Sequence, residues 1–383
     1  MDGKPEAVVL SIEKYNEIIS NTQLPIPNEA SQNKDESTLF YAKTVLVTGG
    51  AGYIGAHLAR QLINSGHKVV VLDDLSVGKR ENVPEAAKFI EGSSGDVNLL
   101  RDIFTNEKID AVMHLAASIE VEESARLPVK YLENNVMNTA RLLGALDEAG
   151  VKNIIFSSTA AVYGEQENQP IAENATPKPN NPYGYSKYLA EQVVKYYSET
   201  RGFNAIVFRY FNACGSDFDG KIKATHESHL LAKLMQVILG KGEELVINGN
   251  DYQTHDGTCV RDYVHVLDIA EAHLLALGYL FKESSGAHPN LASTFEGEEQ
   301  KMKGFKIYNI GTGRGVSVLE ITNAAAESLN KMVPMQLGQR RPGDSAESVA
   351  DNAKIKNELG FEPKFSDLET IVKTAYIQAR NHQ

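Results

Sequence analysis

The sequence predicts an α/β fold in which a doubly wound, Rossmann-like parallel sheet is followed by a smaller C-terminal α/β region. Short apolar, β-branched segments alternate with amphipathic helical segments over residues 43–212. The first apolar segment ends in closely spaced glycines, and after residue 212 the pattern becomes less regular and the loops longer. Continuous apolar strands separated by helices are typical of a parallel sheet that is covered on both faces.

The expected elements follow in chain order from residue 43. Strands are expected within 43–50, 68–74, 88–97, 110–117, 152–160 and 204–215. Helices are expected within 54–67, 138–150 and 182–199. The later region predicts a helix over 230–242, a strand over 244–249, and a strand that turns into a helix over 262–281, with Asp268 as its N-cap. Residues 283–304 are polar and are expected to form a surface insertion.

Composition limits the class of protein. The net charge of −12 disfavours non-specific binding of nucleic acid or of an anionic membrane. Two cysteines in 383 residues do not form a disulfide framework. The N-terminus does not resemble a signal peptide, and no apolar run approaches the ~18 residues that a membrane-spanning helix needs. We therefore expect a cytoplasmic protein that uses neither a membrane nor nucleic acid as a partner.

The first strand–helix junction, "VLVTGGAGYIGAHLA", predicts a phosphate-binding turn. Gly49, Gly52 and Gly55 allow a tight turn, a close backbone approach to a pyrophosphate, and close helix packing. Asp73 ends the next strand, where a carboxylate accepts hydrogen bonds from an adenosine ribose and repels a 2′-phosphate. This pattern favours NAD over NADP. Asp96 follows a later strand and is either an acceptor for the adenine amino group or a helix cap.

A second pattern predicts the reactive centre. Tyr183 and Lys187 lie four residues apart in a helical stretch, so they share one face. The preceding strand ends in hydroxyl residues, among them Thr159. An adjacent ammonium and a positive nicotinamide ring would lower the pKa of the phenol from about 10, so that Tyr183 could act as a general base. These groups suit removal of an alcohol proton while hydride passes to NAD.

Eight motifs identify a family. They are "TGGAGYIGAH", "LENNV", "FSSTAAVYG", "PYGYSK", "RYFNACG", "GNDYQTHDGTCVRDYVHV", "YNIGTGRGVSV" and "RRPGD". Through them, residues 43–375 resemble the extended short-chain dehydrogenases/reductases, and among these the UDP-glucose 4-epimerase family. The resemblance implies an N-terminal extension over residues 1–42, an NAD-binding Rossmann domain over 43–212, and a UDP-sugar-binding domain over 213–383 with some segments returning to the NAD domain.

The resemblance also implies a reaction and a set of site residues. Tightly bound NAD+ takes hydride from C4 of the hexose, the 4-keto sugar turns about its pyrophosphate link, and hydride returns to the other face. The residues expected to bind NAD are Gly49, Gly52, Tyr53, Ile54, Gly55, Asp73, Asp96, Val97, Asn134, Tyr183, Lys187 and Tyr210. The residues expected to bind UDP-glucose or UDP-galactose are Thr159, Asn212, Leu230, Arg261, Arg341, Asp344 and Ser348. A homodimer is expected as well.

Four positions depart from the family pattern. Thr159 stands where many members have Ser, Ile119 replaces a common Lys, and Asn248 replaces a common Phe near the uracil. Ser348 falls where a bulky residue, often Tyr, closes the sugar pocket of glucose-only members. A small side chain there leaves room for a 2-N-acetyl group. The sequence therefore extends the hypothesis to UDP-N-acetylglucosamine and UDP-N-acetylgalactosamine.

Two other functions compete with epimerisation. A sugar-nucleotide 4,6-dehydratase needs an acidic pair after the threonine, but Ala160 and Ala161 stand there. A non-catalytic NAD-binding protein would not need the tyrosine, lysine and threonine together. No metal site is expected, because His226 and His229 lack the His-Glu-x-x-His spacing of a zinc helix.

Overall fold

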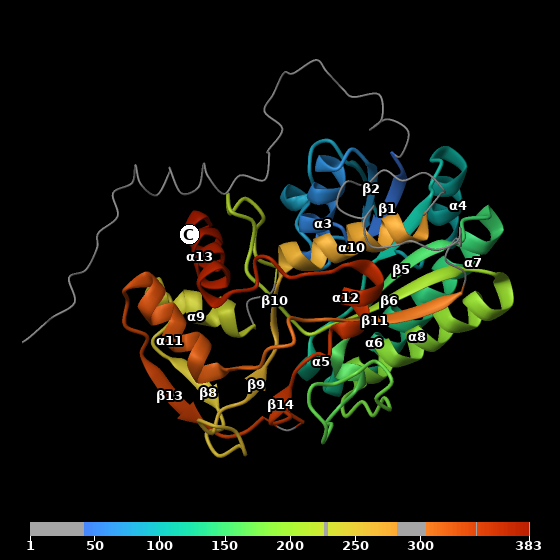
Figure 1. The fold of residues 1–383 in the computed structure, drawn as a ribbon. Coiled ribbons are helices and arrows are strands. Elements are labelled where there is room, and N and C mark those ends of the chain that lie inside the picture. The colour runs from blue at the N-terminus through green and yellow to red at the C-terminus, as the bar shows by residue number, and fades with distance from the viewer. Residues whose placement is uncertain (1–41, 226–228, 282–303, 342, 383) are drawn as a thin grey trace, which may run out of the picture. The chain divides into compact units, whose positions relative to one another are not determined.

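The computed structural model describes residues 42–225, 229–281, 304–341 and 343–382. Ala42–Gln383 form one compact unit around a seven-stranded parallel sheet with the strand order β11-β6-β5-β4-β1-β2-β3 (Figure 1). Its strands are β1 Thr44–Thr48, β2 Lys68–Asp73, β3 Lys88–Glu91, β4 Ala111–His114, β5 Asn153–Thr159, β6 Asn204–Tyr210 and β11 Phe305–Ile310. The doubly wound parallel sheet expected from the sequence is confirmed.

The order of the strands reverses beside β1. The chain runs outward from β1 through β2 to β3, then crosses to β4 on the other side of β1 and continues through β5 to β6. Thr48 at the end of β1 therefore pairs with Leu72 in β2 and with His114 in β4. Loops leave the carboxyl ends of these strands in opposite directions at such a point, which is where open α/β sheets bind ligands.

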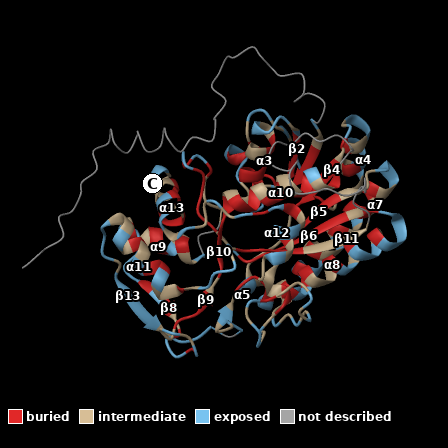
Figure 2. Cartoon of the chain, viewed as in Figure 1, coloured by how far each residue is buried: buried red, intermediate tan, exposed pale blue. Residues whose placement is uncertain are grey.

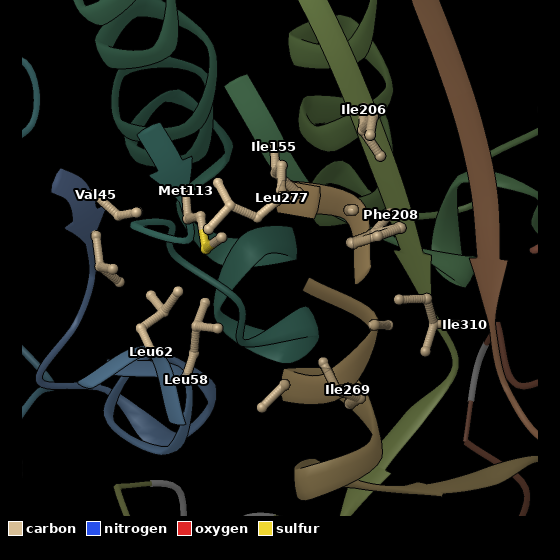
Figure 3. Packing of buried hydrophobic residues seen from close by; sticks show 14 of the residues in the cluster. Val45, Leu58, Leu62, Met113, Ile155, Ile206, Phe208, Ile269, Leu277 and Ile310 are labelled. Carbon is tan, nitrogen blue, oxygen red and sulfur yellow. The ribbon is translucent and has the colours of Figure 1, made fainter. Parts of the chain in front are cut away.

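Helices cover both faces of this sheet. One face carries α3 Tyr53–Asn64, α10 Val266–Leu280 and α12 Ala353–Leu359; the other carries α4 Val97–Asn106, α7 Asn138–Ala149 and α8 Pro182–Arg201. Leu58 and Leu62 of α3, Ile269 of α10 and Val45 of β1 meet in the first of the two cores (Figure 3). The sheet is buried between the two layers (Figure 2), which explains its continuous apolar strands.

Local signals define the ends of α8. The Asn181 side chain accepts a hydrogen bond from the Gly184 N–H at 2.8 Å and caps the first turn. Pro182 occupies a first-turn position, where its missing N–H costs nothing. Gly202 ends the helix in the left-handed conformation at φ 70°. Pro182 thus starts the helix at a fixed point, and Tyr183 and Lys187 follow in its first two turns.

The chain after β6 forms short strands and three further helices. The small sheets pair β7 Asn212–Cys214 with β10 Tyr263–His265, β8 Leu245–Asn248 with β13 Met335–Gly338, and β9 Val260–Arg261 with β12 Val316–Ser317 and β14 Glu347–Ser348. The helices are α9 Leu230–Ile238, α11 Val318–Leu329 and α13 Leu368–Asn381. The remaining helical segments are η1 Arg80–Asn82, α5 Val121–Arg126, α6 Pro128–Tyr131, the π-helical Leu132–Met137 and η3 Ala160–Val162.

One local prediction was wrong. Helix α10 begins at Val266, and its cap is His265, whose ring accepts from the Leu267 N–H at 3.2 Å. Asp268 lies inside the first turn and accepts instead from the Lys364 N–H at 2.8 Å and the Ser366 hydroxyl at 2.5 Å. Its carboxylate thus binds a distant loop, a partner that local spacing does not reveal.

Two expectations lie outside the described residues. These are the N-terminal extension, except for residue 42, and the polar insertion at 283–304, except for Gly304. Within the described ranges, no helix has the length and apolar character needed to cross a membrane.

Candidate functional site

A cleft of about 1850 Å³ opens at the carboxyl ends of the central strands. Its walls bring together most of the residues expected from the sequence. These are Gly49, Gly52, Tyr53, Ile54, Gly55, Asp73, Asn134, Thr159, Tyr183, Lys187, Tyr210, Asn212, Leu230, Arg261, Arg341, Asp344 and Ser348. The cleft thus joins the end of the large sheet to the short strands of the later region.

The glycine turn has no room for side chains. Gly49 has a φ of 72°, and a Cβ there would lie 2.7 Å from the Ala116 nitrogen. A Cβ on Gly55 would lie 2.2 Å from the Gly49 carbonyl oxygen. The first turn of α3 carries neither an acidic residue nor a side-chain cap. Because the first N–H groups of a helix lack intrahelical partners, this turn fits the pyrophosphate of a dinucleotide.

The carboxylate of Asp73 is held at the wall of the cleft by main-chain donors. Its oxygens accept from the Ala51 N–H and the Leu75 N–H, both at 2.9 Å. Burial raises the pKa of this carboxyl, while the two hydrogen bonds oppose the rise. A carboxylate fixed beside the glycine turn fits a ribose diol and would repel a 2′-phosphate.

Asp96 and Val97 are not part of the cleft wall. Asp96 is the N-cap of α4, and one carboxylate oxygen accepts from the Asn98 N–H at 3.0 Å and from the Leu99 N–H at 3.2 Å. Val97 is the first residue of that helix. Of the two roles left open for Asp96, the structure supplies the cap, and the adenine contact remains an expectation.

The reactive centre forms where β5 ends beside the start of α8. Burial is the largest influence on Tyr183 and raises the pKa of its phenol to about 12, although a hydrogen bond with Thr159 lowers it. Lys187 is only 3% exposed, and its Nζ lies 4.6 Å from the centre of the Phe156 ring. Burial lowers the pKa of this ammonium to about 7, and the charge of Glu191 opposes that change.

The expected lowering of the phenol pKa is therefore not produced by the protein's own groups. The spacing of Tyr183 and Lys187 predicts an ammonium near the phenol. It does not predict the desolvation, which is the larger influence on the phenol pKa. Lys187 is itself so buried that its charge titrates near neutral pH. A base at this position consequently depends on further positive charge from a bound group.

The far end of the cleft presents two arginines from the later region. Arg261 donates through Nη1 to the Val260 and Ser345 carbonyl oxygens, each at 2.9 Å. When the Asn248 amide is oriented with its oxygen towards Arg341, that oxygen accepts from Arg341 Nε and Nη2 at 3.0 and 3.1 Å. Ser348 pairs with Arg261 across β14 and β9. Two guanidinium groups next to a small hydroxyl residue fit a diphosphate joined to a sugar.

The departures and the residues that sequence reasoning missed also have defined places. Ile119 and Asn248 line the cleft. Among the residues that the structure describes, no group of three or more His, Cys, Asp or Glu could hold a metal ion; His229 is described but His226 is not.

A buried ion pair between Glu191 and Arg209 lies behind the reactive centre, and its only sequence signal was two charged residues on buried faces.

Known proteins resemble the chain over most of its length. The NAD dependent epimerase/dehydratase family matches residues 45–292. A UDP-glucose 4-epimerase of Azospirillum brasilense is 42% identical over 333 residues, which is 86% of this chain and 90% of that protein.

Solved structures resemble its fold. The crystal structure of UDP-glucose 4-epimerase from Brucella ovis in complex with NAD has a TM-score of 0.80 and 38% identity, and the match covers 88% of this chain and 98% of that one. The UDP-Glc/GlcNAc 4-epimerase of Campylobacter jejuni has a TM-score of 0.74 and 36% identity, with coverage of 89% and 100%. The chain therefore belongs to the NAD dependent epimerase/dehydratase family and, within it, to the family of the UDP-glucose 4-epimerases.

Proposed function

We propose that this protein interconverts UDP-glucose and UDP-galactose at C4 with tightly bound NAD. One observation carries the proposal: Tyr183, Lys187 and Thr159 line the same cleft as the glycine turn and Asp73. When bound, NAD+ supplies a hydride acceptor for C4 and a positive charge beside the phenol. The protein's own residues then control the proton, the sugar and the diphosphate.

The proton passes through Tyr183. Its phenol takes the proton of the sugar 4-hydroxyl as the C4 hydride leaves, and gives a proton back when hydride returns to the opposite face. Thr159, whose hydroxyl lowers the pKa of the phenol, holds the same sugar oxygen. Lys187, in its charged form, stabilises the phenolate through one turn of α8. No net oxidation results, so the products are the C4 epimer and the regenerated cofactor.

The diphosphate stays fixed while the 4-keto sugar turns. Arg261 and Arg341 provide positive charge at the end of the cleft away from the glycine turn, and the net charge of the chain is −12. Two local arginines are therefore needed to attract a nucleoside diphosphate. Because the sugar is linked to the held diphosphate through a rotatable bond, either face of C4 can be presented to the same hydride acceptor.

The same cleft is proposed to accept N-acetylated UDP-hexoses. Ser348 lines the cleft with a small side chain, and a relative with comparable coverage is named a UDP-Glc/GlcNAc 4-epimerase. Parallel assays of UDP-galactose and UDP-N-acetylgalactosamine test this proposal. Ser348→Tyr should abolish turnover of the acetylated sugar and retain that of the plain one. Absence of turnover of UDP-N-acetylgalactosamine by the unaltered protein would refute it.

We also propose a cytoplasmic homodimer. Large apolar side chains are exposed along α5, α6, the π-helical segment Leu132–Met137 and α8. They are Val121, Leu127, Val129, Leu132, Met137, Tyr185 and Tyr196. Pairing of two copies through these helices would remove this surface from water. Light scattering during gel filtration measures the mass, and Tyr196→Glu should shift it towards the monomer; a monomeric unaltered protein contradicts the proposal.

The decisive experiment begins with protein purified without added cofactor. We expect NAD to co-purify and UDP-galactose to be converted to UDP-glucose. Tyr183→Phe should lower kcat by about 10²–10⁴-fold, because it removes the group that transfers the proton. A variant with unaltered turnover would disprove the mechanism. A product that absorbs in alkali as a 4-keto-6-deoxy sugar would instead indicate the dehydratase, for which Ala160 and Ala161 offer no acid or base.

A further inference from the structure

A buried ion pair joins the three elements that carry the reactive centre. Arg209 of β6 donates to Glu191 of α8 through Nη2 at 2.6 Å and through Nε at 3.0 Å. The Ser158 hydroxyl of β5 donates to the same carboxylate at 2.5 Å. Glu191 is fully buried and Arg209 is 2% exposed. One carboxylate thus connects α8, β5 and β6 in the core beneath the cleft.

Each member of this group is next to a residue of the cleft. Glu191 follows Lys187 by one turn on the same face of α8. Ser158 immediately precedes Thr159, and Arg209 immediately precedes Tyr210. Ser158 also lines the cleft, and Glu191 shares one face of α8 with Lys187, so the group lies directly beneath the reactive centre. It therefore acts on the reactive centre through the backbone of both strands and through one helical turn.

Burying this ion pair costs desolvation free energy, so its presence in the core needs a physical explanation. Desolvating two charges consumes much of their attraction, and an apolar pair of equal volume is often at least as stable. Here Arg209 also donates through Nη1 to the Glu173 carbonyl oxygen at 3.4 Å, and its guanidinium carbon lies 4.7 Å from the centre of the Tyr163 ring. These additional contacts hold the guanidinium in one place, as expected for a rigid support.

We propose that Glu191 is a positioning residue of the epimerisation reaction: its carboxylate fixes α8 against β5 and keeps Lys187 charged beside Tyr183. This inference rests on the proposed function and adds to it a residue that does not touch the substrate. Glu191 acts only through Lys187 and through the strand that carries Thr159.

The surroundings of Lys187 support the electrostatic part. On α8 it faces Tyr183 and Glu191, on β5 the Phe156 ring, and on β6 Arg209 lies beyond Glu191. His114 of β4 is buried, and its pKa is lowered to about 3, so it is neutral. Among the described groups, the charge of Glu191 is the one that raises the pKa of Lys187. Neutralising this carboxylate should lower the Lys187 pKa further.

The test compares Glu191→Gln with the unaltered holoenzyme. The amide keeps the size and the Ser158 contact but removes the charge. We expect the acidic limb of the kcat–pH profile to move up by about one pH unit, which is about a tenfold loss of kcat at neutral pH. KM for UDP-galactose should change little. Glu191→Asp, which keeps the charge, should restore most of the profile.

A titration that does not use turnover separates this inference from the proposed function. The ultraviolet absorbance of the Tyr183 phenolate, taken as the difference from Tyr183→Phe, should titrate at higher pH in Glu191→Gln. An unaltered protein that does not turn over UDP-galactose refutes the function. An active unaltered protein, with the same profile and the same phenolate titration in Glu191→Gln, refutes the inference.

Two further variants exclude a purely structural role. The double variant Glu191→Met with Arg209→Met replaces the pair by apolar side chains and should restore thermal stability lost in Glu191→Gln. We expect it to keep the shifted pH profile; a profile like that of the unaltered protein would overturn the proposal. Glu173→Gln is the matched control. The Glu173 carboxylate is half-buried and accepts a hydrogen bond from the Asn309 N–H at 2.9 Å, so its partner is not Lys187. This variant should leave the kcat–pH profile unchanged.

Discussion

The two ends of the cleft are formed by different kinds of chemical group. At the end near β1, Gly49 and Gly55 leave no space for side chains, and main-chain N–H groups hold the Asp73 carboxylate in place. At the other end, Arg261, Arg341 and Ser348 extend side chains from short strands and loops of the later region. The first end is therefore fixed by backbone sterics, and the second by side-chain chemistry.

This difference predicts how each end responds to mutation. A wall made of backbone should fail where an added methyl group would overlap main-chain atoms. A wall made of side chains should lose affinity in steps and change its choice of sugar without unfolding. Substitutions at the two ends should thus separate effects on folding and cofactor retention from effects on KM.

The largest effect is expected at the backbone end. Gly55→Ala would place a Cβ 2.2 Å from the Gly49 carbonyl oxygen, whereas Gly52→Ala would place one 3.2 Å from the same atom. The first change forces the turn apart and should cost about 3 kcal/mol or more of unfolding free energy. We expect Gly55→Ala to lose both stability and co-purified NAD, and Gly52→Ala to retain most of its stability but to lose NAD, because Gly52 lies where the backbone approaches the pyrophosphate.

Thermal unfolding and the NAD content of the purified variants measure this pair. Gly278→Ala serves as a control for the added methyl group alone, because a Cβ there would meet no atom within 4 Å. If Gly55→Ala retained its cofactor as well as Gly278→Ala does, the backbone account of this end would be wrong.

The next effect concerns Lys187, between the two ends. The pKa of its ammonium is about 7 in the folded protein, whereas an exposed lysine has a pKa of 10.5. Between these values the unfolded chain binds more protons, so stability falls as pH decreases from 10.5 to 7 and stays low below that. Lys187→Met removes this loss, which is at most about 5 kcal/mol.

Lys187→Met should therefore be nearly inactive and yet more stable than the unaltered protein at neutral pH. Unfolding measured by denaturant at several pH values checks this, at equal NAD content. The gain should shrink towards pH 10. A variant that is less stable at pH 7 would show that Lys187 stabilises the fold. Burial of its ammonium group would then not lower the free energy of unfolding.

The sequence signals for the backbone end are local. Gly49, Gly52 and Gly55 follow an apolar strand directly, and Tyr183 and Lys187 need only the period of a helix. Arg261 and Ser348 lie far apart in the chain and become neighbours only through the pairing of β9 with β14. The family resemblance assigned both residues to the sugar-nucleotide site but did not predict this pairing.

Other features could not be predicted because they depend on tertiary burial. The phenol pKa of Tyr183 rises to about 12 through desolvation, which no spacing encodes. The Glu191–Arg209 pair joins residues eighteen positions apart, and the sequence places each on a buried face without showing that they meet. Asp268 has a partner nearly a hundred residues away. Local pattern therefore locates the groups that carry chemistry, and packing decides their protonation.

The smallest effect is expected at the side-chain end, where two adjacent arginines offer a matched pair. Arg341 lines the cleft and donates to Asn248. Arg340 instead lies over the Tyr252 ring and donates to Asp251 at 2.7 Å. Arg341→Leu removes a charged donor to the diphosphate and should raise KM for UDP-galactose about 10–100-fold, since such bonds are worth about 1.5–3 kcal/mol.

Arg340→Leu should leave KM within about twofold, because exposed ion pairs contribute little. Steady-state kinetics of both variants, with NAD content and thermal unfolding measured alongside, decide the matter. If Arg341→Leu lost NAD or unfolded as Gly55→Ala is expected to, the two ends of the cleft would not be independent. A raised KM with intact cofactor would instead establish that side chains alone hold the diphosphate. The backbone end would then be independent of them.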